Sequence, residues 1–315
     1  MYLRIVIAFL FTFTASITAF AQQAASYSVP RTEYGHPDFQ GVWMLDFLTP
    51  LERPDGVQNL ILSQEQAIEL ASADQFQLSE VADPDDYIIG ATSLGLVQGE
   101  YRSSVIVQPE DGKIPFSNAG SALEDKITSS YYYLFDHVEQ RPPAERCIGG
   151  SVNPPIRPPP FVLPFQIFQT EEHVVIYTED ASGVRIINLS DTQRPQALTS
   201  TNGNSIAKWQ GDTLTINTSH FSNGNPGREN AGRTVLVGEN TRVMERFTRV
   251  SESELLYQYT VEDSSYYDAP WSGEFSFHSL DAVVYEWSCH EGNYALPGIL
   301  RGGQLEAARL AEEEN

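Results

Sequence analysis

From residue 164 onward the chain consists largely of short stretches in which apolar and polar residues alternate. A period of two places alternate side chains on opposite faces of a β-strand. Turn-forming residues separate the stretches, as at Ser182-Gly183 and at Gln210-Gly211-Asp212. Short, evenly spaced strands of this kind predict a mainly β domain whose antiparallel sheet closes into a lipocalin-like barrel, with a β-sandwich as the alternative. The predicted strands cover residues 165–169, 174–179, 184–189, 207–210, 213–218, 242–250, 254–262, 274–278 and 283–289.

The N-terminal half has a different pattern, which predicts one or two helices at the periphery of the barrel. Residues 62–78 have a partial apolar face, and Ser63 with Gln66 forms a capping box at its start. Residues 119–138 are a second helix candidate. Between the two, residues 104–115 predict a β-hairpin, because proline opens its turn and glycine closes it.

A proline-rich segment, residues 141–164, interrupts the pattern. So many prolines exclude regular secondary structure, because each one removes a backbone donor and fixes its own φ angle. We interpret the segment as a loop over a single β-rich domain spanning residues 22–305, with a domain boundary as the alternative. Residues 306–315 are predicted to form an acidic C-terminal tail.

The first 21 residues have the pattern of a secretory signal peptide. Arg4 supplies the positive charge, an apolar stretch follows, and Ala19-Phe20-Ala21 provides a cleavage site with small residues. The apolar stretch is shorter than the roughly 20 residues that span a bilayer. We therefore expect cleavage after Ala21, a periplasmic or secreted protein, and no membrane span.

The charge balance limits the partners. The chain has 19 Lys and Arg against 42 Asp and Glu, a formal net charge of −23. Such a surface repels phosphate backbones, so nucleic acid is not expected as a partner. The sequence has no phosphate-binding loop, dinucleotide motif, nucleophile elbow or zinc-protease motif. We expect no metal and no cofactor, and the sequence does not specify an oligomeric state.

The tripeptide Cys289-His290-Glu291 places three reactive side-chain types together, and the only other cysteine is Cys147. Two cysteines in an oxidising compartment usually pair, which predicts a disulfide that anchors the proline-rich loop. The alternatives are a thiolate nucleophile assisted by His290, or a metal site. Adjacent Cys and His side chains on a strand point in opposite directions, which disfavours the metal.

The chain also resembles a recurrent family of exported bacterial proteins, most of which have no assigned activity. The resemblance implies a lipocalin-like barrel and covers nearly the whole chain after the signal peptide. The similar segments are HPDFQGVW (36–43), VIVQPEDG (105–112), ERC (145–147), QIFQT (166–170), WQGDTL (209–214), ERFTRV (245–250), TVED (260–263) and CHEGNY (289–294).

Candidate site residues follow from the same alternation. His290 and Glu286 share one face of the last predicted strand, about 13 Å apart, so they cannot bond to each other. A histidine beside a carboxylate is a common acid–base pair, and a partner for His290 would come from another strand. The alternative is a structural histidine that fixes the turn at Gly292-Asn293, where Asn293 is a further candidate ligand residue. The possible carboxylate partners are Glu262, Glu245 and Glu179.

Arg185 lies in the middle of a predicted strand, where an arginine faces water or pairs with a buried anion. We predict a salt bridge with Glu179 across the hairpin, or else a clamp on a ligand carboxylate or carbonyl. His36 and Asp38 are candidates for the same mouth of the barrel. Trp209, Trp271 and Trp287 are candidates for an aromatic wall.

Two functions agree with this sequence. The first, which it slightly favours, is an exported enzyme that acts on a small organic molecule by His/carboxylate acid–base chemistry, as a lyase, isomerase or hydrolase. The alternative is an exported protein that binds a small, partly apolar ligand without turnover. Catalysis requires a titratable pair that converges in the cavity, whereas binding requires only suitable walls.

Overall fold

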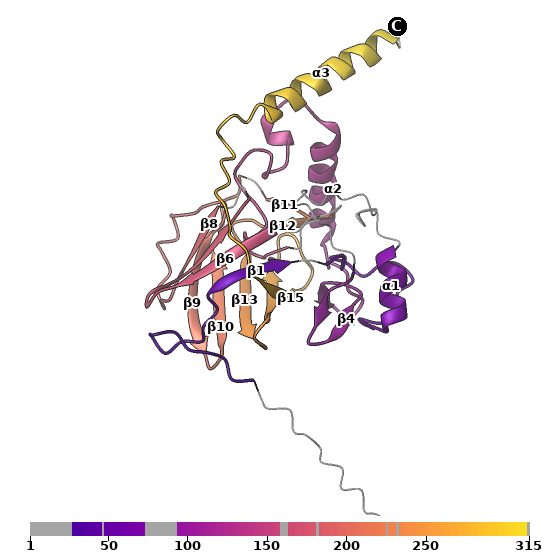
Figure 1. Cartoon of the computed structure of the whole chain (residues 1–315). Helices are drawn as coiled ribbons and strands as arrows, with labels where there is room; N and C mark the ends of the chain where they lie inside the picture. The colour runs from indigo at the N-terminus through magenta and orange to yellow at the C-terminus, as the bar shows by residue number, and fades with distance from the viewer. Residues whose placement is uncertain are drawn as a thin grey trace, which may run out of the picture.

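Nine strands in the described part of the chain form a closed, mainly antiparallel barrel (Figure 1). This computed structural model describes residues 27–45, 47–72, 93–157, 163–180, 183–224, 226–230 and 233–313, so the predicted signal peptide lies outside it. Pairing of the first strand with the last closes the sheet, which confirms the barrel and excludes the sandwich. In spatial order the strands are β1 (Gly41–Leu45), β6 (Leu163–Gln169), β7 (His173–Thr178), β8 (Val184–Asn188), β9 (Asn204–Gln210), β10 (Thr213–Ser219), β13 (Arg242–Arg249), β14 (Glu254–Glu262) and β15 (Trp271–Leu280).

One pair of barrel strands departs from the predicted antiparallel pattern. β8 and β9 meet in parallel at Asn188 and Ile206, so the barrel is mixed. Parallel neighbours need a crossover connection rather than a tight turn, and residues 189–203 form that connection.

The barrel interior is filled by side chains, many of them aromatic. On β14 the buried residues alternate as Leu255, Tyr257, Tyr259 and Val261, as expected for the inner face of a half-buried strand. On β15 the inner positions are likewise buried. Ring contacts between neighbouring strands join Phe165, Phe247, Tyr257, Phe275 and Phe277 into one cluster. The interior is therefore a packed core in this conformation.

The segment before β1 covers one end of the barrel. Trp43 is buried, and its indole N–H donates to the carbonyl of Phe39 (2.8 Å). The guanidinium carbon of Arg249 lies 5.4 Å from the centre of the Trp43 ring. An arginine over an indole face is favourable, so this contact helps to hold the segment against the barrel end.

Helix α2 (Asn118–Tyr133) packs beside the hairpin of β11 (Gly227–Asn230) and β12 (Arg233–Leu236). The buried carboxylate of Glu124 on α2 accepts a hydrogen bond from the backbone N–H of Thr234 (3.1 Å). The sequence predicted α2 with a later end, because the chain leaves the helix at Tyr133 and returns only to a short turn, Val138–Gln140. The hairpin was not predicted.

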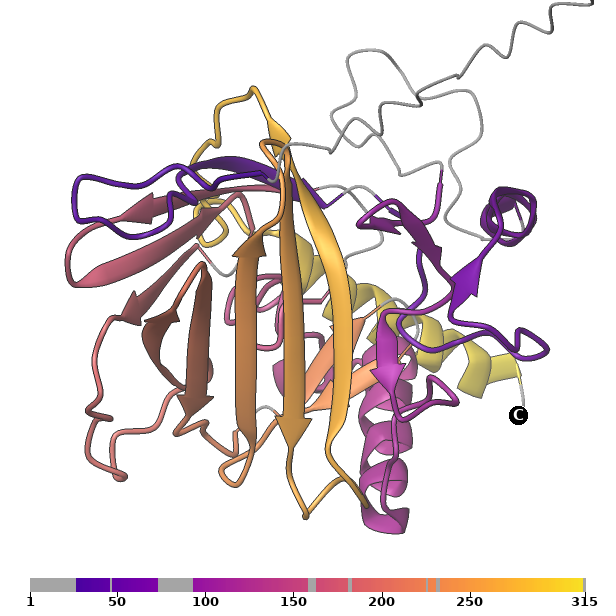
Figure 2. The same cartoon turned by 90° about the horizontal axis from the view of Figure 1, so that it is seen from below.

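A small sheet lies against the outside of the barrel, as Figure 2 shows for β4 and its neighbours. It consists of β2 (Ile61–Leu62), β3 (Leu96–Val97) and β4 (Glu100–Arg102), and helix α1 (Gln64–Ser72) packs on it. The capping box of α1 is confirmed, because Ser63 and Gln66 bond reciprocally at 3.0 and 3.3 Å. The hairpin predicted over residues 104–115 is wrong, because β5 (Ile106–Gln108) pairs with β15 instead.

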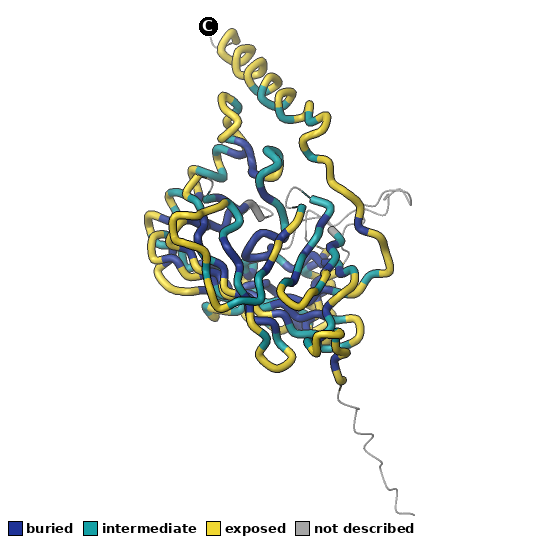
Figure 3. Tube along the Cα trace, turned by 90° about the vertical axis from the view of Figure 1, so that its left-hand side faces the viewer, coloured by how far each residue is buried: buried dark blue, intermediate teal, exposed yellow. Residues whose placement is uncertain are grey.

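The C-terminal part lies outside the barrel. Residues 281–288 contain no regular strand, and helix α3 (Ala295–Glu313) has no buried residue. Figure 3 shows α3 projecting from the body as a largely exposed helix. It includes most of the predicted acidic tail. Within the described residues, no helix has the length and apolar character that crossing a bilayer requires.

Candidate functional site

A buried ion pair lies inside the barrel between β8 and β13, which are far apart in the sequence. Arg185 and Glu245 are 5% and 0% exposed, and they form two parallel bonds, of which Nη1 to Oε1 measures 2.9 Å. Both side chains occupy inner positions of their strands. Bidentate pairing of this kind is the strongest geometry for an arginine and a carboxylate.

Neighbouring polar groups complete this site. The hydroxyl of Tyr257 donates to Glu245 Oε1 (2.8 Å), and Arg185 Nη2 donates to the hydroxyls of Ser205 (3.1 Å) and Thr218 (3.3 Å). These five residues, here called the polar centre, are all buried. They come from five strands, β8, β9, β10, β13 and β14.

The electrostatics keep the ion pair charged and the tyrosine neutral. Burial opposes the charge on Arg185, but the adjacent Glu245 carboxylate outweighs it, so the pKa of Arg185 is raised. Burial and then the Glu245 charge raise the pKa of Tyr257 well above its ordinary value. Tyr257 is therefore a hydrogen-bond donor to Glu245 and not a source of phenolate near neutral pH.

The middle of the proline-rich segment reaches this centre. Residues 152–157 are all buried, and we call residues 150–157 the plug. The carbonyl of Val152 accepts a bond from Arg185 Nη1 (3.4 Å), and the N–H of Ile156 donates to the hydroxyl of Tyr257 (2.9 Å). The polar centre is thus covered by the backbone of the plug.

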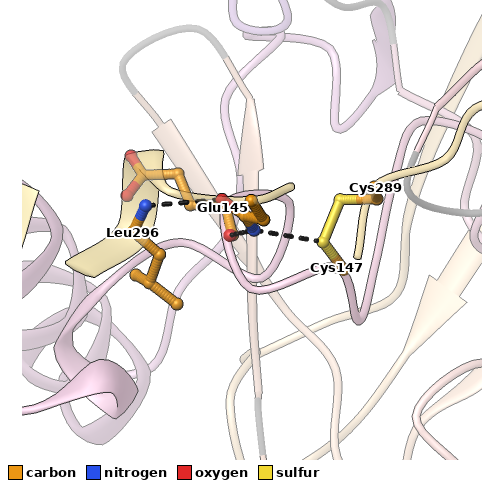
Figure 4. The surroundings of a disulfide bond; sticks show 5 residues. Glu145, Cys147, Cys289 and Leu296 are labelled. Atoms are coloured by element: carbon orange, nitrogen blue, oxygen red, sulfur yellow. Dashed lines mark hydrogen bonds between the residues drawn. A yellow bond between two sulfur atoms is a disulfide. The ribbon is translucent and has the colours of Figure 1, made fainter. Parts of the chain in front are cut away.

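The prediction that this segment is an irregular, stapled loop is confirmed for its described part. Cys147 and Cys289 form a disulfide across a sequence separation of 142, with Cα atoms 5.8 Å apart. The bond lies just before the plug. Near it, Asn293 Nδ2 donates to the carbonyl of Glu145 (3.4 Å) and approaches Cys147 Sγ (3.5 Å). Figure 4 shows the disulfide with Glu145 nearby. The side chain of Asn293 therefore helps to hold the turn at Gly292-Asn293 against the segment around the disulfide.

The structure corrects the predicted partner of Arg185. Its carboxylate partner is Glu245, while Glu179 accepts a bond from the backbone N–H of Tyr285. Glu179 follows the end of β7 and is only partly buried, whereas Arg185 points into the barrel. The two residues are close in sequence, but the Arg185 side chain lies inside the barrel, whereas the Glu179 side chain contacts the segment that follows β15.

The predicted strand over residues 283–289 is also wrong, so His290 does not follow a strand of the barrel. β15 pairs with β14 on one side and with β1 and β5 on the other, so β15 offers no free edge to residues 283–289. His290 and Glu286 are consequently exposed outside the barrel. Glu262 is exposed at the end of β14. The structure does not bring His290 together with an inward carboxylate.

The candidates near the N-terminus lie at the other end of the barrel. His36 stacks on Trp209 with ring centres 5.3 Å apart, and the carbonyl of Asp38 accepts a bond from Arg249 (2.7 Å). Arg249 lies four residues from Glu245 on β13, which is about 13 Å along a strand. His36 and Asp38 therefore do not reach the mouth where Arg185 lies.

The three tryptophans do not form one wall. Trp271 is fully buried on the inner face of β15, in edge contact with Tyr259 and Tyr267. Trp209 lies at the end of the barrel beside His36. Trp287 is 56% exposed and lines a surface hollow of about 430 Å³ beside the disulfide.

Sequence reasoning missed Tyr257 and the plug contacts. Tyr257 belongs to a clear inner-face alternation on β14, so its burial could have been predicted, although its partner could not. The plug contacts are made by backbone atoms of Val152 and Ile156. Backbone contacts leave no signal in residue identity. Among the described residues, no three His, Cys, Asp or Glu side chains are arranged to hold a metal ion.

A comparison with models of known protein families finds none that matches the chain, and a comparison with curated proteins finds no similar protein. The polar centre and the plug are therefore the features that bear on function.

Proposed function

We propose that this protein is an exported, non-catalytic binding protein for a small, partly apolar ligand, which enters the barrel when the plug withdraws. The observation that carries the proposal is that backbone groups of the plug, the Val152 carbonyl and the Ile156 N–H, occupy the bonding positions of the polar centre. A ligand with an acceptor and a donor at similar spacing would replace them. Ligand sites commonly combine apolar walls with a few polar groups that fix orientation.

Binding fits this geometry better than catalysis. Both oxygens of Glu245 already accept bonds, Oε1 from Arg185 and Tyr257 and Oε2 from Arg185. A carboxylate held in this way has both oxygens engaged by protein donors, so neither is directed at a ligand. His290, the best sequence candidate for a base, is outside the barrel. The polar centre can orient a ligand without taking its proton.

The disulfide makes plug withdrawal compatible with a folded chain. Cys147 is tied to Cys289 outside the barrel, and the plug begins three residues later. The anchor stays in place when residues 150–157 move, so the plug can return. Export agrees with this disulfide and with the signal-peptide pattern of the first 21 residues.

The test uses N-phenyl-1-naphthylamine, a neutral apolar dye that fluoresces in dry sites, with the mature oxidised protein. We expect saturable one-site binding and energy transfer from the buried residues Trp43 and Trp271. The transfer should persist in Trp287→Phe, which removes the tryptophan of the surface hollow. Tyr257→Phe removes the hydroxyl that accepts the Ile156 N–H, so the plug is held less firmly and the dye should bind more tightly or more rapidly.

Two results would overturn the proposal. One is that no saturable binding of the dye is seen. The other is that energy transfer disappears in Trp287→Phe, because the dye would then occupy the surface hollow. If the protein turned over a ligand, and if His290→Ala abolished that turnover without changing thermal stability, the enzyme hypothesis would replace the binding hypothesis.

A further inference from the structure

The surface hollow beside the disulfide is built from two parts of the chain that lie far apart in sequence. One wall comes from residues 144–145, and the other comes from residues 287–299, which include the first turns of α3. The Cys147–Cys289 disulfide joins the two parts, and Figure 4 shows Glu145, Cys289 and Leu296 around it. The hollow has a volume of about 430 Å³, within the range of about 300–1,000 Å³ that small-ligand sites commonly have.

Much of the wall is apolar. Ala144, Ala295, Leu296 and Ile299 line the hollow together with Trp287. Trp287 is 56% exposed, although burial of so large an apolar side chain is usually favourable. In the part of the chain that the structure describes, no aromatic or cationic side chain lies against the Trp287 ring. The ring is therefore available to a ligand in the hollow.

The charge at the hollow is negative. Glu291 lines it, is exposed, and forms no ion pair or hydrogen bond with another described residue. The second lining carboxylate, Glu145, accepts two bonds of 2.9 Å from Arg141, so its charge is already balanced. None of the lining residues is cationic. A bound cation would therefore have Glu291 as a counter-ion and would meet no like charge from the wall.

The first turn of α3 does not reverse this preference. A helix N-terminus attracts anions through N–H groups that have no partner in the helix. Here the N–H of Leu296 donates to Oδ1 of Asn293 (3.4 Å), and the N–H of Gly298 donates to the carbonyl of Tyr294 (3.1 Å). Pro297, between them, has no N–H to offer. The helix start thus leaves few donors for an anion.

We propose that this hollow binds a small organic cation with an apolar body, of the alkylammonium class. The ammonium group lies over the Trp287 ring beside Glu291, and the alkyl part lies against Leu296 and Ile299. An indole face attracts a cation, and an unpaired carboxylate nearby adds to the attraction. The net charge of −23 also raises the concentration of cations near the surface. This site lies outside the barrel and is independent of the barrel ligand proposed above.

The test compares hexylammonium, hexanamide and hexanoate, which have similar length and differ in charge, by ligand-observed NMR titration of the mature oxidised protein. We expect hexylammonium to bind about fivefold more tightly than hexanamide, as for a partly exposed cation–π contact assisted by one carboxylate. Hexanoate should bind more weakly than hexanamide. Added salt should weaken hexylammonium and leave hexanamide unchanged, because it screens only the charged ligand.

Two pairs of variants locate the site. Glu291→Gln should reduce the preference for hexylammonium over hexanamide, whereas Glu286→Gln, which removes the same charge from an exposed residue outside the hollow, should not. Trp287→Leu keeps an apolar wall without the ring, so it should weaken hexylammonium severalfold and change hexanamide little. Tyr285→Leu is its control, because Tyr285 is an aromatic residue of the same segment, 64% exposed and outside the hollow.

Three results would overturn this inference, and none of them bears on the barrel. Equal affinity for hexylammonium and hexanamide would mean that only apolar contact acts at the hollow. Equal losses in Glu291→Gln and Glu286→Gln would mean that the overall negative charge, and not this site, attracts the cation. No saturable binding of hexylammonium would show that the hollow is not a cation site. All four substituted side chains are exposed, so the variants should fold, which circular dichroism checks.

Discussion

At the scale of single residues, the Arg185–Glu245 pair sets the character of the interior. Two charges have been taken out of water, and several bonds compensate them. Buried pairs contribute little net stability compared with an apolar replacement, but removing one partner leaves an uncompensated charge. The pair is therefore better suited to specifying a polar centre than to stabilising the fold.

A double-mutant cycle tests this view. Arg185→Met should lower the free energy of unfolding by about 3–5 kcal/mol, because Glu245 is left buried and unpaired. Adding Glu245→Leu should recover most of the loss. Urea denaturation followed by circular dichroism measures each variant. If the double variant is as unstable as the two single losses added together, the charges do not act as a pair.

Residue identity predicted part of this centre. Arg185 in an apolar strand indicated either a salt bridge or a ligand clamp, and Glu245 was among the predicted carboxylates. The chosen salt-bridge partner, Glu179, was wrong because proximity in a hairpin says nothing about which strands meet across a barrel. Glu245 lies 60 residues from Arg185 in the chain. Only the closed sheet brings the two strands into reach.

At the scale of elements, alternation located most barrel strands to within a few residues. The failures concern the partners of a strand. Residues 283–289 have a strand-like sequence but find β15 already paired on both sides. Residues 113–115 do not pair with β5, which pairs with β15 and not with its neighbour in sequence. Periodicity describes the faces of a strand and not its partners.

The contact between β14 and β15 at Gly273 yields a prediction at this scale. Gly273→Ala should destabilise the protein by about 1–3 kcal/mol, because the new methyl group would overlap the Tyr259 ring in a packed interior. Gly298→Ala is the control. It lies in α3 with no atom near the new methyl group, so it should be neutral or stabilise slightly through helix propensity. Thermal unfolding of both variants measures the difference, and equal melting temperatures would contradict the packing described.

At the scale of the whole molecule, the sequence predicted the closed barrel and the covalent anchor, but not what fills the barrel. A cavity was expected, with site residues around it. Instead aromatic rings and the plug fill the interior, and the surface hollow lies outside, beside Trp287. The reason is that an irregular backbone segment can fill the interior of a barrel, just as a ligand can. Its contacts with the polar centre depend on chain path, which composition and periodicity do not specify.

Stability at alkaline pH tests the interior as a whole. Tyr257, Tyr259 and Tyr267 are fully buried, and burial raises the pKa of each above its ordinary value. Their contribution to stability is complete below pH 10 and is lost as pH rises, because the unfolded chain ionises first. Arg228 acts in the opposite sense, since its lowered pKa of about 10 makes the folded protein release that proton before the unfolded chain does.

Three tyrosines outweigh one arginine, so the free energy of unfolding should fall above pH 10, by about 2.7 kcal/mol per pH unit. Urea titrations between pH 9 and 12 measure the fall, and absorbance at 295 nm should show phenolate forming as the chain unfolds. Tyr259→Phe removes one buried tyrosine whose hydroxyl has no partner among the described residues, so it should halve the slope. Tyr294→Phe changes a tyrosine that is 83% exposed and should leave the slope unaltered. Phenolate absorbance that develops fully before unfolding would mean that these tyrosines are open to water, and the packed, plugged interior described here would then be wrong.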